Sequence, residues 1–296
     1  MKTSKSRRLF LSSLASLAAA EPASRLSASQ SPPLPSSNVA RASDRYVNPR
    51  KVLLWESTRK EIREALEEGR LKAAIVPTGS TEQHNEALAM IQDTASAVLI
   101  AQQAALQLYP QVIVSTPVPV GISPYWMNRK GTLTLRPETF LAMVFDICDS
   151  LRQHGIKTIF IVNGHGGNDQ PLKTHMAEFR SKLGITIDAC SYWDAYHSSE
   201  AIQAEVNRIM QGGLASVPGH AGEFETSFAL AAWPERVHRE GVDYEIAHLT
   251  LSPEELKGDR KGYYDSLLAT AEKGELLIPI AVDWVAARVR SLIAQT

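Results

Sequence analysis

Three side chains of the types that hold metal ions follow one apolar run of the sequence. The run is residues 73–76, Ala-Ala-Ile-Val, and it predicts a buried strand that ends at a turn. Beyond the turn, Glu82 and His84 are two residues apart, which places them on one face of extended backbone. Asp93 then precedes a helix-like run at residues 94–108. These types suit zinc, manganese or iron, although a solvated loop with Asp93 as a helix cap is the alternative.

A second candidate is His165, within the run Asn-Gly-His-Gly-Gly-Asn at residues 163–168. It follows the apolar stretch 157–162, Lys-Thr-Ile-Phe-Ile-Val, which is typical of a strand buried on both faces. Ligand sites in open α/β sheets gather at the carboxyl ends of strands, where His165 falls. A phosphate loop is disfavoured because the glycine spacing matches neither known pattern. A glycine-rich turn with an incidental histidine stays open.

The third candidate stretch is residues 220–227, His-Ala-Gly-Glu-Phe-Glu-Thr-Ser, which opens a helix-like run. One histidine and two carboxylates, His220, Glu223 and Glu225, can together supply a metal ligand and a proton-transfer group. The alternative is an ordinary first helical turn, in which acidic residues favour the helix dipole.

Helix-like and strand-like segments alternate around these stretches. The expected helices are 59–68, 94–108, 137–154 and 170–183, and the expected strands are 72–76, 111–120, 157–162 and 186–192. This alternation predicts one α/β domain with a mostly parallel sheet.

The composition limits the class of protein and the partners to be considered. The 296 residues are 44% hydrophobic and 21% charged, as in ordinary soluble proteins, and can bury a sizeable core. With 31 basic and 32 acidic residues the net charge is −1, without a long run of either sign, so nothing favours nucleic acid as a partner. Cys148 and Cys190 lie in apolar segments; an oxidising compartment permits a disulfide, but buried free thiols are the better expectation.

The N-terminus has the features of a targeting signal. Residues 1–20 combine a basic start, the pair Arg7-Arg8 and a short apolar run that ends in alanines, which is similar to a bacterial twin-arginine signal. We therefore expect the twin-arginine export machinery as a partner and a periplasmic or otherwise exported location. Residues 21–48, rich in Ser, Pro and Ala, predict a flexible linker. Residues 49–296 form the expected folded domain, which carries the three candidate stretches.

Taken together, the motifs resemble the creatininase family of metal-dependent amidohydrolases, from about Trp55 to the C-terminus. The matching segments are Gly-Ser-Thr-Glu-Gln-His at 79–84, Asp-Thr at 93–94, Gly-Thr-Leu at 131–133, the run 163–168, the run 220–227 and the family-like run 269–275. The resemblance implies a three-layer α/β/α sandwich, a centre of two divalent metal ions (Zn, Mn or Fe) and a homo-oligomer, commonly a hexamer.

The resemblance also implies roles for individual residues. Glu82 and His165 would hold one metal ion, His84 the second, and Asp93 both. In creatininase a glutamate two residues after the motif's histidine completes the second site. This chain has Gly167 there, so we expect Glu223 to complete the site instead, with Glu225 as the alternative.

His220 matches the histidine that is assigned to proton transfer. No Gly-x-Ser-x-Gly motif occurs in the chain, and the metal-dependent reaction needs no nucleophilic serine.

Two departures from the family pattern concern the substrate. The sequence of the loop from Asn85 to Gln92 differs from the family pattern. Tyr125-Trp126 stands where relatives often have a Glu-His pair. We expect Asn85, Tyr125 and Trp126 to contact the substrate, because aromatic side chains suit stacking on a ring or sugar. Packing at a subunit contact is the alternative for the two aromatic residues.

Three classes of function follow. The leading one is hydrolysis of a C–N bond in a cyclic or linear amide, as in the commoner chemistry of the family. The second is hydrolysis or ring opening of an oxidised sugar or cyclitol. The third is a non-catalytic binding protein that descends from an enzyme, which the near-complete set of expected ligands disfavours. The partner in the first two classes is a small-molecule substrate, and creatinine itself is not the expected one.

Overall fold

The computed structural model describes residues 51–238, 240–241 and 265–296. The expected signal segment and linker, residues 1–48, lie outside the described residues. Within the described part of the chain, no helix is both long and apolar enough to cross a membrane.

The sheet has four parallel strands in the order β2-β1-β3-β4. The strands are β1 (Ala73–Thr78), β2 (Val112–Val114), β3 (Thr158–Asn163) and β4 (Thr186–Ser191). The α-helices are α1 (Arg59–Glu67), α2 (Gln92–Gln107), α3 (Pro137–Gln153), α4 (Gly166–Leu183), α5 (Glu200–Ile209), α6 (Glu223–Ala232) and α9 (Ala271–Ile293). Strand and helix alternate through most of this order, which confirms the predicted α/β class.

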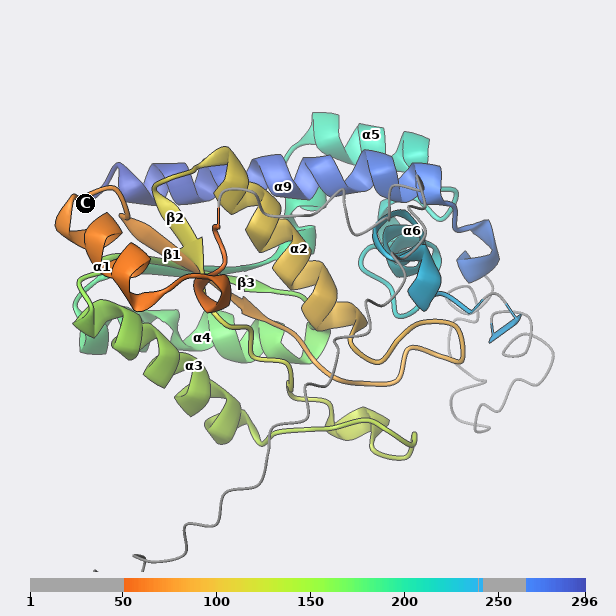
Figure 1. Cartoon of the computed structure of the whole chain (residues 1–296). Helices are drawn as coiled ribbons and strands as arrows, with labels where there is room; N and C mark the ends of the chain where they lie inside the picture. Colours follow the sequence, from red (N-terminus) through yellow and green to blue (C-terminus); the bar gives the residue numbers. More distant parts are fainter. Residues whose placement is uncertain (1–50, 239, 242–264) are drawn as a thin grey trace, which may run out of the picture. The chain divides into compact units, whose positions relative to one another are not determined.

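Helices cover both faces of the sheet, as Figure 1 shows. Side chains of β1 and β3 alternate between two separate cores: Ile75 and Phe160 face α2 and α9, whereas Val76 and Ile161 face α3 and α4. This alternation follows from the two-residue period of a strand, and both faces are apolar because both are covered. The arrangement is the predicted three-layer α/β/α sandwich.

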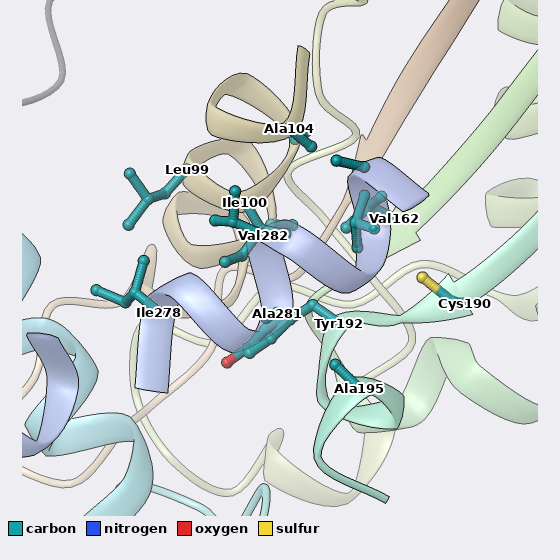
Figure 2. Packing of buried hydrophobic residues seen from close by; sticks show 14 of the residues in the cluster. Leu99, Ile100, Ala104, Val162, Cys190, Tyr192, Ala195, Ile278, Ala281 and Val282 are labelled. Carbon is teal, nitrogen blue, oxygen red and sulfur yellow. The ribbon is translucent and has the colours of Figure 1, made fainter. Parts of the chain in front are cut away.

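The core between the sheet and α9 is drawn in Figure 2, where side chains of α2, β3 and β4 meet Ile278, Ala281 and Val282. Cys190 belongs to this core, while Cys148 of α3 lies in the core on the other side of the sheet. Both cysteines are free and buried. Burial raises the pKa of the Cys148 thiol to about 12, so it is an apolar packing group.

Two predicted elements differ in extent. The strand expected at 111–120 is regular only over Val112–Val114, and Val118 adds one isolated bridge to Thr78. Pro117 and Pro119 have no N–H to donate, so the ladder is not continuous between them. The helix expected at 170–183 begins at Gly166, directly after His165. Glycine is a weak helix former, so the sequence pattern understated the start of this helix.

Candidate metal centre

The ends of β1 and β3 bring two of the candidate stretches together. Thr78 and Asn163 are paired in the parallel register, and the N–H of Gly164 donates to the carbonyl of Thr78 at 2.8 Å. Residues that follow these two strands therefore leave the sheet at the same edge. The loop that carries Glu82 and His84 begins there, and so does the turn that carries His165.

Helix α2 delivers Asp93 to this edge from its first turn. Two glycines allow the close approach. A Cβ added to Gly164 would lie 2.2 Å from the carbonyl oxygen of Asp93, and one added to Gly79 would lie 2.5 Å from Thr94. A side chain at either position would push the helix away from the strand ends.

The carboxylate of Asp93 faces two histidines at once. Its Oδ1 lies 3.0 Å from Nε2 of His84, and its Oδ2 lies 2.9 Å from Nδ1 of His165. Glu82 Oε1 lies 3.3 Å from Nδ1 of His165, and Glu225 Oε2 lies 3.5 Å from Nε2 of His84. Two groups of potential ligands therefore share Asp93, and the ligand atoms of each group lie within 4.8 Å of one another.

Each of these histidines is held by its other ring nitrogen. Nδ1 of His84 lies 3.2 Å from the carbonyl oxygen of Glu82, and Nε2 of His165 lies 3.1 Å from that of Ile122. Because a carbonyl oxygen only accepts, each of these nitrogens carries a proton. The other nitrogens, Nε2 of His84 and Nδ1 of His165, face the carboxylates, and each would offer a lone pair to a cation that displaced its proton, as in metal-binding histidines.

The cluster is buried and strongly acidic. Burial disfavours a charged imidazole, but the carboxylates of Asp93 and Glu225 outweigh burial and raise the pKa of His84 to about 10. The same opposition between burial and the carboxylates of Asp93 and Glu82 raises the pKa of His165 to about 10. Burial, opposed in part by His84, raises the pKa of the Glu225 carboxyl to about 8. The site therefore favours added positive charge.

Glu223, the residue expected to complete the second site, does not reach it. Its buried carboxylate accepts from the backbone N–H groups of Gln211 and Gly212 at 3.0 and 2.8 Å and pairs with Lys273. Residues two apart on a helix point about 200° apart, so α6 can direct only one of its two glutamates to the cluster. Glu225 takes that place, and the expectation for Glu223 was wrong.

His220 lies beside the same cluster. Its Nδ1 is 3.7 Å from Glu82 Oε1, and its ring centroid is 4.6 Å from that of His84. Burial and the charge of His84 lower the pKa of His220 to about 3, so its ring is neutral. Ligand atoms of Glu82, His84 and His220 also lie within 4.8 Å of one another, so distance alone allows His220 to be a ligand or a proton donor.

A cavity of about 190 Å³ opens over the cluster. Tyr125, Trp126 and Trp193 contribute its aromatic lining. The ring of Trp126 stacks on His220 at 4.6 Å and 22°, and the hydroxyl of Tyr125 lies 3.3 Å from Nε2 of His165. Asn85 is absent from the described residues that line this cavity; its backbone N–H instead donates to the side chain of Gln83.

Several site residues were not found from the sequence. Asn163 accepts from the N–H of His165 at 3.1 Å and donates to its carbonyl at 2.7 Å, while Asn168 donates to the carbonyl of Gly79 at 3.0 Å. These asparagines brace the turn on which His165 sits. Trp193 follows β4 by two residues, and this position after a strand end is the signal that identifies it.

Comparison with known proteins relates this chain to a family of hydrolases. A family model described as creatininase, creatinine amidohydrolase, matches residues 55–289. The chain is 32% identical over 202 residues to the 3-dehydro-scyllo-inosose hydrolase of Thermotoga maritima; the match covers 67% of this chain and 61% of that protein. This chain thus matches less than two thirds of the length of that relative. It is 26% identical over 238 residues to the creatinine amidohydrolase of Pseudomonas putida, covering 73% and 88%.

Solved structures agree on the fold. A variant of creatininase of the zinc–zinc type and a manganese form of creatininase each superpose with a TM-score of 0.68 at 24% identity. Each match covers 81% of this chain and 98% of the other.

Proposed function

The chain belongs to the creatininase family, and we propose that it is a metal-dependent hydrolase that cleaves a C–N bond in a small cyclic or linear amide. One observation carries the proposal: two groups of buried ligand-type side chains share the carboxylate of Asp93. The relative from Pseudomonas putida is named for hydrolysis of such a bond.

The residues fit two divalent cations. Oε2 of Glu82 is buried and accepts no hydrogen bond from any of the described residues, whereas the buried Oδ2 of Asp93 has Nδ1 of His165 as its neighbour at 2.9 Å. A buried carboxylate oxygen without a partner is costly, and a cation removes that cost. Three carboxylates offset three of the four positive charges of two such ions, two histidines add neutral nitrogen ligands, and the mixed oxygen and nitrogen set suits Zn, Mn or Fe.

We assign the residues to two sites. Glu82 and His165, through Nδ1, would hold one ion; His84, through Nε2, and Glu225 would hold the other; Asp93 would serve both. When bound, such ions lower the pKa of water toward neutrality and stabilise negative charge on a carbonyl oxygen.

His220 is the residue that moves a proton in this proposal. Its Nδ1 faces the cluster, whereas its ring is fixed against Trp126. When the C–N bond breaks, the departing nitrogen takes up the proton that the attacking water loses, and His220, at hydrogen-bond reach of the site, can mediate that transfer. The aromatic lining provides a flat wall for a planar amide or a ring.

A second candidate substrate is an oxidised cyclitol or sugar. The relative from Thermotoga maritima is the inosose hydrolase, and it is more similar in sequence than the creatinine amidohydrolase. The wall of Tyr125, Trp126 and Trp193 also suits the apolar face of a sugar-like ring.

A substrate panel on the metal-loaded protein separates these possibilities. The panel contains cyclic amides, linear amides and formamides in one arm, and keto-cyclitols and oxidised sugars in the other. Formation of a new amino group from a compound of the first arm supports the first proposal, and formation of a ring-opened acid from a compound of the second arm supports the second. Binding of panel compounds without turnover of any of them contradicts the proposed activity and supports a binding protein.

We also propose export through the twin-arginine machinery to the periplasm and assembly as a homo-oligomer, a hexamer by family resemblance. The pair Arg7-Arg8 supports the first proposal. Measurement of the mass of the protein in solution tests the second, and a monomer would contradict it.

A further inference from the structure

The side chain of Gln83 connects the backbone of Asn85 to the ring of His220. Nε2 of Gln83 lies 2.8 Å from Nε2 of His220, and Oε1 of Gln83 accepts the backbone N–H of Asn85 at 3.0 Å. The backbone of Gln83 is itself anchored, because its N–H donates to Oγ1 of Thr132 at 3.1 Å. Gln83 is buried, with 8% of its surface exposed.

The contact with Asn85 decides which end of the amide faces His220. A backbone N–H can only donate, so the Gln83 atom that it meets must be the carbonyl oxygen. The NH₂ group of Gln83 therefore points at His220 and donates. Asn85 reaches this position with a φ of +56°, a conformation that asparagine tolerates better than most residues.

The donor fixes the tautomer of a neutral His220. Since Nε2 of His220 accepts from Gln83, its lone pair lies there and the ring proton is on Nδ1. Nδ1 is the nitrogen 3.7 Å from Oε1 of Glu82, on the side of the ligand cluster. A protonated ring nitrogen has no lone pair for a metal ion.

We propose that Gln83 is a positioning residue: it holds the proton of His220 on Nδ1, so that His220 donates a hydrogen bond toward the reaction site and stays out of the metal coordination. This inference rests on the proposed metal-dependent function. His220 is close enough to Glu82 and His84 to be a metal ligand, and a proton on Nδ1 prevents this. Stacking on Trp126 keeps the ring in the plane that this hydrogen bond requires.

Replacement of the donor by an acceptor should reverse the role of His220. In Gln83→Glu, the carboxylate can only accept a hydrogen bond, so the ring proton of His220 lies on Nε2 and the lone pair moves to Nδ1. Two nearby cations disfavour a doubly protonated ring. His220 then becomes an additional metal ligand, and His220→Ala added to Gln83→Glu removes it again.

Cobalt(II) provides the readout, because its visible absorption spectrum responds to the number and type of its ligands. The protein is stripped, loaded with Co²⁺ alone and measured as wild type, His220→Ala, Gln83→Glu and the double variant. We expect the spectra of wild type and His220→Ala to coincide, that of Gln83→Glu to shift, and the double variant to return to the wild-type spectrum.

The matched control is Gln92→Glu. Gln92 is also buried and lies beside the cluster, but its side chain donates to Ser96 and to the carbonyl of Glu225. It adds the same charge without an acceptor for His220, so any change in its spectrum should persist when His220→Ala is added. If Gln83→Glu does not fold, Gln83→Met, which only removes the donor, should give a smaller shift that also depends on His220.

The outcomes separate the inference from the proposed function. A wild-type protein that takes up no cobalt contradicts the metal centre, and the inference with it. A wild-type protein that binds cobalt, combined with a Gln83→Glu spectrum that is unchanged or shifts equally without His220, overturns the inference alone. A wild-type spectrum that changes on His220→Ala also overturns it, because His220 would already be a ligand.

Discussion

Asp93 Oδ1 lies 3.0 Å from Nε2 of His84, and this contact joins the first turn of α2 to the loop after β1. The other oxygen of the same carboxylate turns to His165. One side chain thus belongs to both groups of candidate ligands, which is the arrangement expected of a carboxylate shared by two cations.

Removal of the shared charge should therefore empty both sites. In Asp93→Ala, two cations would repel one another without a carboxylate between them, so metal content and turnover should fall together. In His220→Ala, metal content should stay near that of the wild type while turnover falls roughly 10²- to 10⁴-fold, the scale of general acid–base catalysis. Elemental analysis alongside kinetics checks both. Equal metal loss in the two variants would place His220 among the ligands.

The two glutamates of α6 should separate metal binding from stability. Glu225→Gln removes a candidate ligand, so it should lower the metal content of one site with a small effect on folding. Glu223→Gln removes a buried partner of Lys273, so it should keep the metal and lower the free energy of unfolding by about 1.5 to 3 kcal/mol. Elemental analysis and denaturant unfolding measure the two effects. Loss of metal in Glu223→Gln but not in Glu225→Gln would show that Glu223 is the ligand.

Stability of the metal-free protein should depend on pH in a defined window. The pKa values of His84 and His165 are about 10 in the folded chain, against 6.5 for an ordinary histidine. A raised pKa stabilises the fold fully below pH 6.5, and this contribution is lost as the pH rises through 10. The raised pKa of Glu225, about 8, acts in the same direction between pH 4.5 and 8.

Chelated protein should therefore lose stability between pH 6.5 and 10, as followed by denaturant unfolding. Metal-loaded protein should lose less over this range, because cations take the place of the protons. Identical pH profiles with and without metal would refute this coupling.

Export provides an independent prediction. Replacement of Arg7 and Arg8 by lysine should leave the precursor in the cytoplasm with the fold intact, because the twin-arginine route reads that pair. Cell fractionation with circular dichroism of the retained protein measures this. Normal export of the variant would refute the assignment.

The layout of the site could largely be predicted from the sequence. The apolar strands predicted at 72–76 and 157–162 are each followed by ligand-type residues, which indicated that Glu82, His84 and His165 lie at strand ends of one sheet. Because β1 and β3 are adjacent and parallel, the residues that follow them lie close together.

The sequence pattern did not predict which side chains of α6 face the site or which backbone groups of the loops contact it. Glu223 and Glu225 are equivalent ligand types, and only the direction of α6 distinguishes them. Asn85 stands in a rewritten loop, but its contribution is a backbone N–H to Gln83, which no side-chain motif records. Both depend on tertiary packing that local propensity does not determine.

Elemental analysis of protein purified without chelator tests the central claim most directly, combined with turnover of the compound that the substrate panel identifies. The account predicts close to two Zn, Mn or Fe ions per chain, loss of turnover when the ions are removed and its return when they are restored. A protein that contains no metal and still hydrolyses its substrate would contradict the account.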